Sequence, residues 1–301
     1  MAADDSHRAG IVAVAGRPNT GKSTLVNALV AEKISIVTPK PQTTRHSIMG
    51  IVDRPEGQLV FVDTPGLHHS GGRRLNRVLN RNAGASIAGA DLALLLIDAR
   101  GWRDGDEFAL RQLERSDVPV VLAINKIDLV RPRSALLPLL EESAARHDFL
   151  DIVPISARRG ENLERLLAVL LAHLPPGPPL FPPGQKTDRG LDFRVAEIIR
   201  EKLLLALREE VPYGIAVQVE RMERDGELLR IEAVIWVERR SHRGIVIGRG
   251  GRVLKQVGQA ARAELECLLG RKVYLQTHVK LRENWSENEA ALRQLGYDPC
   301  R

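Results

Sequence analysis

An octapeptide near the N-terminus carries the residue types that bind phosphate, in the spacing that such binding needs. Residues 16–23 read GRPNTGKS, which fits the pattern G-x-x-x-x-G-K-[ST]. Glycines let backbone amides surround an anion, and a helix that starts here adds the positive end of its dipole. Lys22 can reach the outer phosphate oxygens, and the Ser23 hydroxyl can bind Mg²⁺. The candidate nucleotide-binding residues here are Gly16, Arg17, Pro18, Asn19, Thr20, Gly21, Lys22, Ser23 and Thr24.

A second motif, Asp63-Thr64-Pro65-Gly66, follows the apolar run Leu59–Val62. A carboxylate at this position can hold Mg²⁺, usually through a water molecule, and the Gly66 amide can bind a γ-phosphate. Because the motif follows the octapeptide in a second strand–loop unit, we expect both to serve one site. The motif adds these candidate nucleotide-binding residues: Asp63, Thr64, Pro65, Gly66 and Leu67.

A third motif, Asn125-Lys126-Ile127-Asp128, indicates which base is bound. The Asp128 carboxylate can accept hydrogen bonds from the N1–H and the 2-amino group of guanine. Adenine offers no such pair of donors, so it would leave a buried carboxylate unsatisfied. Asn125 can tie this loop to the octapeptide, and the Lys126 side chain can lie along the base. Backbone amides of Ser156 and Ala157 come after the next strand and can approach guanine O6.

The segment Lys40–Arg45 holds two adjacent threonines between the first and second motifs. A threonine here can bind Mg²⁺ when the γ-phosphate is present and release it when the phosphate leaves, which makes a switch. We favour Thr44 over Thr43. The candidate metal ligands are Ser23, Thr44 and Asp63, and the candidate catalytic residues are Lys22, Thr44 and Gly66.

The elements that must position these motifs alternate between strand and helix. The candidate strands are short apolar runs, and several are apolar throughout, as expected for strands buried on both faces. Amphipathic stretches separate them, so we expect a mostly parallel sheet with helices on both faces. The expected strands are Ile11–Ala15, Leu59–Val62, Leu92–Ile97, Val118–Ile124 and Ile152–Ile155. The expected helices are Thr24–Ala31, Leu75–Ala88, Glu107–Ser116, Ala135–Arg146 and Leu163–His173.

With these motifs in order, residues 10–173 resemble the GTPase domain related to translation factors, an α/β P-loop fold. The resemblance implies GTP, GDP and Mg²⁺ as ligands. Leu67 departs from the glutamine that many small GTPases use to orient the attacking water, so this chain resembles GTPases that place the water by other means. Asn19 is similar to the asparagine that helps bind a monovalent cation in potassium-stimulated relatives, which makes K⁺ a second candidate cofactor.

The composition changes at residues 175–184, PPGPPLFPPG, where six of ten residues are proline. Proline lacks the amide donor and fixes φ, so this stretch is neither helix nor central strand and is expected to form a semi-rigid extended linker. After it, a helical pattern (Asp192–Glu210) precedes two strand patterns joined by Asp225-Gly226, a hairpin signal. A Gly-rich turn, a helix (Gly251–Leu269), a strand (Val273–Lys280) and a C-terminal helix near 287–295 follow. We therefore expect a G domain at 1–174, a linker at 175–184 and an α+β domain at 185–301.

Positive charge is concentrated in the second half. The whole chain carries a net charge of +6, whereas residues 239–282 hold 11 basic and 2 acidic side chains, a net +9. Within this window Gly248–Gly251 fits G-x-x-G and precedes apolar residues at helical spacing. The loop and the α-β-β-α-α-β order resemble the second type of KH domain, in which such a loop lets the backbone approach RNA phosphates closely. The candidate RNA-binding residues are Arg243, Ile247, Gly248, Arg249, Gly250, Gly251, Arg252 and Lys255.

A GTPase domain, a proline-rich linker and a C-terminal type II KH domain together resemble a family of bacterial GTPases that assemble the small ribosomal subunit. The likeness includes Pro39–His46 and the ending Trp285–Tyr297. It implies GTP hydrolysis that is slow without RNA or another activator, and nucleotide-dependent binding near the 3′ end of small-subunit ribosomal RNA. It also implies a monomeric cytoplasmic protein with peripheral contact to the inner face of the cytoplasmic membrane.

Two alternatives stay open from the residues. One is a tRNA-modification GTPase, whose relatives share the first domain's motifs but need a reactive cysteine motif. The other is an RNA-binding module whose G domain senses nucleotide with little catalysis, which Leu67 favours slightly. Cys267 and Cys300 are too few for a disulfide framework or a four-ligand zinc site. The longest apolar run is too short to span a bilayer, and the first ten residues lack a signal-peptide pattern.

Overall fold

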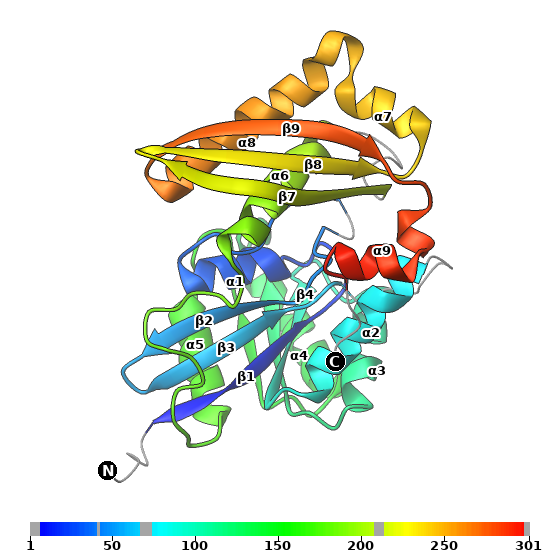
Figure 1. The fold of residues 1–301 in the computed structure, drawn as a ribbon. Helices are drawn as coiled ribbons and strands as arrows, with labels where there is room; N and C mark the ends of the chain where they lie inside the picture. Colours follow the sequence, from blue (N-terminus) through cyan, green and yellow to red (C-terminus); the bar gives the residue numbers. More distant parts are fainter. Residues whose placement is uncertain (1–6, 41–42, 67–73, 208–213, 298–301) are drawn as a thin grey trace.

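The computed structural model describes residues 7–40, 43–66, 74–207 and 214–297. The chain forms two bodies, a larger N-terminal one and a smaller C-terminal one, each built around its own sheet (Figure 1). The expected class, an α/β domain followed by an α+β domain, is confirmed. None of the helices in the described ranges combines the length and the apolar character needed to cross a membrane.

The N-terminal sheet has six strands in the order β2-β3-β1-β4-β5-β6, all parallel except β2, which is antiparallel to β3. The central strand β4 reads LALLLID and is buried at every position because helices cover both of its faces. The six strands are β1 (Arg8–Ala15), β2 (Ile48–Arg54), β3 (Gly57–Asp63), β4 (Leu92–Asp98), β5 (Val120–Asn125) and β6 (Asp151–Pro154).

Helices pack on both faces of this sheet. One apolar core joins the sheet to α1 and α5, and a second core on the opposite face joins it to α2, α3 and α4. Each helix turns an apolar stripe inward; on α5 these residues are Leu163, Leu166, Leu167, Leu170 and Leu171. The helices are α1 (Lys22–Val30), α2 (Arg74–Ala88), α3 (Asp104–Glu114), α4 (Leu137–Arg146) and α5 (Leu163–His173).

The strand β2 is absent from the sequence-based prediction. Its sequence, IMGIVDR, has a glycine in the middle and two charged residues at its end, which weakens the strand pattern. Gly50 faces Val26, Val30 and Ile34, and a Cβ at this position would approach each of them to 2.8 Å. The glycine therefore lets α1 pack closely on the sheet edge.

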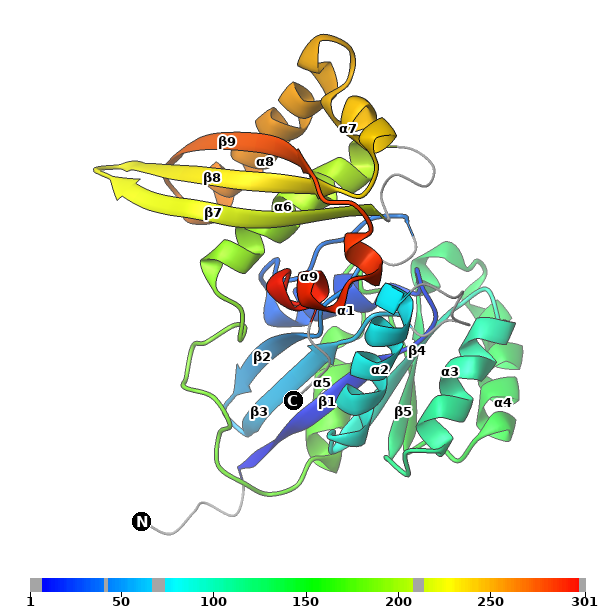
Figure 2. The same cartoon turned by 45° about the vertical axis from the view of Figure 1, so that its right-hand side comes forward.

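The proline-rich segment is held along this edge. The buried side chain of Gln58 accepts hydrogen bonds from the amides of Leu180 and Phe181, each at 2.8 Å, and donates to the Phe181 carbonyl at 2.9 Å. Asp53 accepts from the Gly184 amide at 2.8 Å, and the Ile51 amide donates to the Lys186 carbonyl at 2.9 Å. Figure 2 shows this segment following β2 and β3 on its way to the second body. The segment contains no helix or strand, it turns at residues 183–184, and side chains and backbone of the G domain fix its path.

The C-terminal body is a three-stranded sheet with helices on one face. The strand order is β7-β8-β9, with β7 and β8 antiparallel and β8 and β9 parallel. The predicted hairpin turns at Gly226, whose φ of 59° suits glycine. The elements are α6 (Leu191–Ala206), β7 (Ile215–Asp225), β8 (Leu228–Val237), α7 (Arg240–Ile247), α8 (Arg252–Leu269) and β9 (Lys272–Leu281). The predicted order α-β-β-α-α-β is confirmed. The helix α7, the first after the hairpin, had no predicted range, because only a Gly-rich turn was expected before residue 251.

The end of the described chain returns to the first body. A 3₁₀ turn (Trp285–Glu287) and the helix α9 (Glu289–Gln294) pack against α2 (Figure 2). Trp285 is completely buried there, and its indole N–H donates to the Gly214 carbonyl at 3.2 Å. Leu75, Leu79 and Tyr297 complete this apolar cluster, so the two bodies share a packed contact as well as the linker.

Candidate functional site

The octapeptide forms a tight loop between β1 and α1. Two of its glycines have φ values that suit glycine, 141° at Gly16 and 102° at Gly21. A Cβ at Gly16 would lie 2.5 Å from the Leu96 carbonyl oxygen, and one at Gly21 would lie 2.4 Å from the Asn125 amide nitrogen. The loop therefore fits only with glycine at both positions. It places the first turn of α1, which begins at Lys22, beside the loop that contains Asn125.

Lys22 is folded back over this loop. Its Nζ donates to the carbonyls of Gly16, at 2.8 Å, and Arg17, at 3.0 Å. Burial lowers the pKa of Lys22 to about 8, and the attraction of Asp63 opposes this change. An anion beside the ammonium would favour its charged form. This geometry allows the Lys22 ammonium to leave the two carbonyls and contact phosphate oxygens when a nucleotide binds.

The three predicted metal ligands lie together. The Ser23 and Thr44 hydroxyls are 2.9 Å apart, and the Asp63 carboxylate is fully buried next to them. Within the described residues neither Asp63 oxygen makes a hydrogen bond of normal geometry. Burial raises the pKa of this carboxyl, and the hydroxyl of Ser23 and the ammonium of Lys22 counteract part of the effect. Two hydroxyls beside a buried carboxylate form an oxygen donor set that suits Mg²⁺.

The two threonines of the preceding loop have different partners. Thr43 Oγ1 bonds to Thr38 Oγ1 at 2.6 Å and donates to the Lys40 carbonyl at 2.7 Å, so it serves the loop itself. Thr44 faces Ser23. Gly66 lies close to Pro18 and to the Lys22 Nζ. Leu67 lies outside the described residues.

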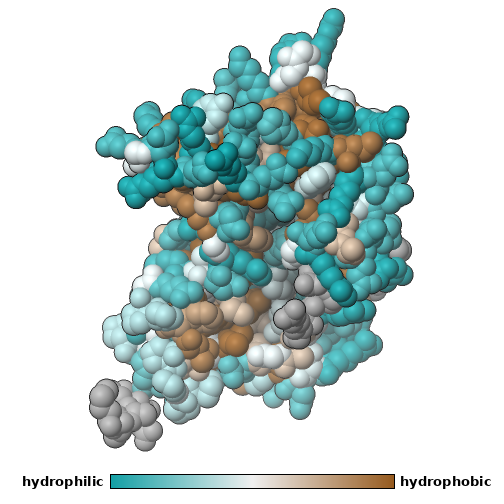
Figure 3. Space-filling model, viewed as in Figure 1, coloured by the Kyte–Doolittle hydropathy of each residue, from teal (hydrophilic) through white to brown (hydrophobic). Residues whose placement is uncertain are grey.

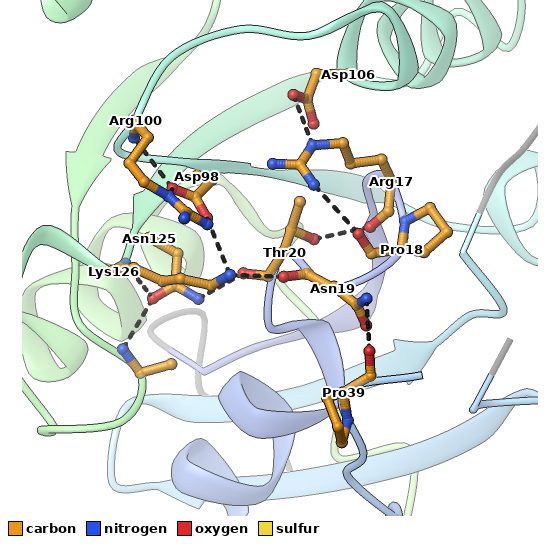
Figure 4. Close-up of polar contacts among 11 residues, drawn as sticks. Arg17, Pro18, Asn19, Thr20, Pro39, Asp98, Arg100, Asp106, Asn125 and Lys126 are labelled. Carbon is orange, nitrogen blue, oxygen red and sulfur yellow. Dashed lines mark hydrogen bonds and ion pairs between the residues drawn. The ribbon is translucent and has the colours of Figure 1, made fainter. Parts of the chain in front are cut away.

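The predicted base-recognition motif joins three loops (Figure 4). The Asn125 side chain donates to the Thr20 carbonyl at 2.8 Å and accepts from the amides of Lys126, at 2.8 Å, and Ala157, at 3.0 Å. The Ser156 hydroxyl donates to Asp128 Oδ1 at 2.6 Å, and this bond holds the pKa of Asp128 below its usual range. Asp128 is therefore an ionised acceptor at neutral pH, as recognition of two guanine donors requires.

A cavity of about 530 Å³ runs between residues 16–23, the phosphate loop, and residues 37–45, the threonine loop that contains Thr43 and Thr44. Its size suits a nucleotide. Its lining combines predicted residues with some that the sequence reading missed. The wall is formed by Pro18, Asn19, Gly21, Lys22, Ser23, Thr24, Ile36, Val37, Thr38, Pro39, Lys40, Thr43, Thr44, Gly66, Lys126 and Arg158.

Three predicted residues turn their side chains away from this cavity. Arg17 pairs with Asp106 of α3 at 3.0 Å, as Figure 4 shows, and Asp106 is completely buried. Thr20 Oγ1 donates to the Arg17 carbonyl at 3.0 Å, and Thr64 Oγ1 donates to the Val14 carbonyl at 2.8 Å. These side chains brace the loops.

The G-x-x-G loop connects α7 to α8 and opens outward. Gly248, Gly250 and Gly251 have φ values of 72°, 61° and 76°. A Cβ on Gly250 or Gly251 would meet no atom within 4 Å, whereas one on Gly248 would lie 2.5 Å from Val253 Cγ2. Gly248 therefore permits close packing inside the domain, and the backbone at the other two glycines is open to an external phosphate.

A groove of about 390 Å³ begins at this loop. The loop end and Lys255 were predicted, and the rest of the groove was missed because its residues are spread over α8 and β9. Its lining is Gly251, Leu254, Lys255, Gly258, Gln259, Arg262, Leu275 and Thr277. Of the predicted basic residues, Lys255 lines the groove, Arg249 lies in the G-x-x-G loop, Arg252 begins α8 and Arg243 lies in α7. Among the described residues no ion pair joins any of these four side chains.

Comparisons with known proteins agree with this geometry. Residues 11–126 match a model described as 50S ribosome-binding GTPase, and residues 210–286 match the KH domain model. The chain is 50% identical over 298 residues to GTPase Era of Stenotrophomonas maltophilia strain R551-3, covering 99% of this chain and 100% of that protein. It is also 50% identical over 292 residues to GTPase Era of Xanthomonas oryzae, covering 97% and 98%. The chain belongs to the Era family.

Two solved Era structures have the same architecture. One is an Aquifex aeolicus Era variant bound to GDP and AlF₄⁻, with a TM-score of 0.93, 40% identity and coverage of 96% of this chain and 99% of that one. The other is Era in complex with MgGDPNP and nucleotides 1506–1542 of 16S ribosomal RNA, with a TM-score of 0.93, 40% identity and coverage of 97% and 99%. The present Era-family chain is accordingly a GTPase with a KH domain.

Sequence reasoning missed two carboxylates that organise the Era-type site, Asp106 beside Arg17 and Asp98 beside Lys126. Asp98 ends β4, and its Oδ2 accepts from Lys126 Nζ at 2.9 Å (Figure 4). Although burial opposes it, the hydrogen bonds from Arg100 and Lys126 hold the pKa of Asp98 well below its usual range. Asp98 thus fixes Lys126, the residue that is predicted to lie along the base. Its place at the carboxyl end of a buried strand, like that of Asp63, was the available signal.

Proposed function

We propose that this GTPase is an assembly factor of the small ribosomal subunit that binds ribosomal RNA near its 3′ end in a nucleotide-dependent way. The observation that carries the proposal is the presence, in one chain, of a guanine-nucleotide cavity and an open G-x-x-G loop on a basic groove. The end-to-end similarity to an Era that holds both GDPNP and a 16S RNA fragment supports it. The 50S in the name of the matched model concerns residues 11–126 only and says nothing of the KH domain.

Mg²⁺ is the metal that these residues fit, with Ser23 and Thr44 as direct ligands and Asp63 acting through water. When bound, Mg²⁺ offsets the negative charge of the β- and γ-phosphates. In this proposal Lys22 contacts the same oxygens, the Gly66 amide binds the γ-phosphate, and loss of that phosphate frees Thr44. Measurement of RNA affinity in the presence of GDPNP and of GDP tests the coupling: equal affinities would refute the nucleotide dependence.

K⁺ is proposed as a second cofactor at Asn19. The Asn19 side-chain amide donates to the Pro39 carbonyl at 3.0 Å, so its oxygen is the side-chain atom that can bind a cation. We expect hydrolysis in KCl to exceed that in NaCl by about tenfold, which corresponds to about 1.4 kcal/mol of barrier. Steady-state phosphate release at matched ionic strength measures this, and Asn19→Ala should remove the difference. Equal rates in both salts would exclude a K⁺ site.

The lowered pKa of Lys22 predicts pH-dependent nucleotide binding. Free protein loses the Lys22 proton near pH 8, whereas bound phosphates keep the lysine charged, so binding takes up a proton above this pH. The affinity for GDP should therefore fall by up to about tenfold per pH unit above about pH 8. Titrations with fluorescent GDP up to about pH 9 measure this. Lys22→Arg, which stays charged, should flatten the dependence, and an unchanged slope in that variant would assign the proton to another group.

We place the G domain at 1–174, the linker at 175–184 and the KH domain at 185–301, and we expect a monomer in the cytoplasm.

Peripheral contact with the inner membrane face is supported only by the exposed basic side chains of the KH domain. Figure 3 shows one face of that domain covered largely by hydrophilic residues, with an apolar patch near α7. Co-sedimentation with anionic vesicles tests this contact.

A further inference from the structure

The loop that presents Thr44 to Ser23 is held from its other side by the KH domain. The Val37 amide donates to Glu201 Oε1 of α6 at 2.9 Å. Arg200 Nη2, also on α6, donates to the Thr43 carbonyl at 2.5 Å. Arg45 Nη1 donates to the Ile215 carbonyl of β7 at 2.7 Å. The threonine loop forms one wall of the nucleotide cavity. Residues of the KH domain thus hold this loop at both of its ends.

Arg200 is oriented by its own helix. It is 2% exposed, and its Nε and Nη2 donate to Glu197, one turn earlier, at 2.7 and 2.6 Å. Burial by itself would raise the pKa of Glu197, but Arg200 holds it below its usual range, so the pair is charged. Breaking a buried charged pair is strongly unfavourable. The Arg200 guanidinium therefore points in a fixed direction, and the threonine loop contacts it through the Thr43 carbonyl.

The contact acts directly next to the reacting end of the site. The Thr43 carbonyl belongs to the peptide group that precedes Thr44, so a bond to it sets the plane from which the Thr44 side chain projects. On the other side of Thr44, His46 is buried. Its ring stacks on that of Tyr297, with the ring centroids 4.4 Å apart, and lies edge-to-face with the ring of Phe193, with the centroids 5.0 Å apart. Contacts with the second body therefore bracket Thr44.

We propose that Arg200, fixed by Glu197, is a positioning residue of the GTP site: the first KH helix holds the loop so that Thr44 meets Ser23 and Asp63. The inference deepens the proposed function and rests on its assignment of Thr44 to the metal and γ-phosphate. GDP, which lacks the γ-phosphate, gains nothing from this positioning. Arg200 therefore stabilises the complex with GTP selectively.

The same helix connects the loop to the RNA groove. Lys33 of the G domain bonds to Glu201 of α6 at 2.7 Å and to Glu264 of α8 at 2.5 Å. The helix α8 begins at the G-x-x-G loop and lines the groove with Lys255 and Arg262. A shift of α8 on binding RNA would be transmitted to α6 and so to Thr44.

The test uses the full-length chain with Glu197→Met/Arg200→Met. Removing both charges avoids leaving one of them buried without a partner, so we expect the fold to be retained. Thermal unfolding of the variant checks this. We expect GDP affinity to stay within about twofold, GDPNP affinity to fall about tenfold, and the Mg²⁺ concentration for half-maximal hydrolysis to rise. Equal changes in GDP and GDPNP affinity, or no change in either, would overturn the proposal.

A matched control lies on the same helix. Arg194 pairs with Glu32 at 2.6 Å and donates to the Lys33 carbonyl at 3.2 Å, so it crosses the same interface before the threonine loop begins. Arg194→Ala should leave the ratio of GDPNP to GDP affinity unchanged. A loss of that ratio in this variant as large as in the double variant would assign the effect to the interface in general and refute the role of Arg200.

A double-mutant cycle separates positioning from general support. In a Thr44→Ala background the residue that Arg200 positions is gone, so the Glu197→Met/Arg200→Met change should cause no further loss of GDPNP affinity. An additive tenfold loss would contradict the proposal. Failure of the proposed function is distinguishable, because it would show as wild-type protein that hydrolyses no GTP or binds no RNA, whatever the variants do.

Discussion

Replacing Asp128 with asparagine should lower the affinity for GDP by about a thousandfold and transfer the preference to xanthosine nucleotides. The carboxylate accepts the Ser156 hydroxyl at 2.6 Å through Oδ1, and it offers its remaining lone pairs to the N1–H and 2-amino group of guanine. An asparagine amide would oppose one of these donors with an N–H. A site built on required hydrogen bonds loses several orders of magnitude when one is reversed. Xanthine carries an oxygen at position 2 and can accept from the new amide.

Competition binding with GDP and XDP measures the exchange of preference. Asp151→Asn is the matched control, since Asp151 begins β6 at the end of the strand opposite to the Ser156 loop. It should leave both affinities as in the wild type. Unchanged GDP affinity in a folded Asp128→Asn variant would show that another group reads the base.

The meeting of the nucleotide motifs could be predicted because topology forces it. Residues 16–23, 63–66, 125–128 and 156–157 each follow a strand of the parallel part of one sheet, and the carboxyl ends of parallel strands share an edge. Asp106 could not be found in this way. It is one of three acidic residues in the first turn of α3, a common pattern at the start of a helix. Only the fold brings it to Arg17.

The fold was predicted where burial leaves a strong pattern and missed where it does not. The strand β4 and the helix α5 are apolar on every face that packs. The helix α7 belongs to the predicted order of elements, but its range was not found because RSHRGIVI combines two arginines, a histidine and a glycine in eight residues. Its glycine and its closeness to Gly248 favour a turn by local propensity, and packing of Val246 in the KH core decides otherwise.

The interface between the domains could not be predicted at all. In the sequence EIIREK, residues 197–202, the charges Glu197 and Arg200 have the spacing of an ion pair on a solvent-exposed helix face. In the structure this pair is buried against the threonine loop. No pattern within α6 distinguishes the two cases, because the covering surface comes from a segment more than 150 residues earlier.

The second large effect is expected at the RNA loop. Gly250→Asp/Gly251→Asp should lower affinity for an RNA of the 16S 3′-end sequence by at least about a hundredfold. Both positions have positive φ, which aspartate tolerates better than most residues, and a Cβ at either would have no atom within 4 Å, so the fold is kept. Two carboxylates would then stand where phosphates must approach, among Arg249, Arg252 and Lys255. Gly248 is unsuitable for this test because a side chain there would collide with Val253.

Two comparisons decide what the loss means. Gly226→Asp adds an acid at another positive-φ glycine with open surroundings, at the tip of the β7–β8 hairpin, and should reduce RNA affinity by less than about twofold. Gly250→Asn/Gly251→Asn adds similar volume without charge, so the difference between it and the aspartate pair isolates repulsion of phosphate. Basal GTP hydrolysis should be unchanged in all three, because the nucleotide cavity is lined by the other domain. If the aspartate pair still binds RNA tightly, the arginines of the exposed basic face bind it, and the G-x-x-G backbone is not the phosphate clamp.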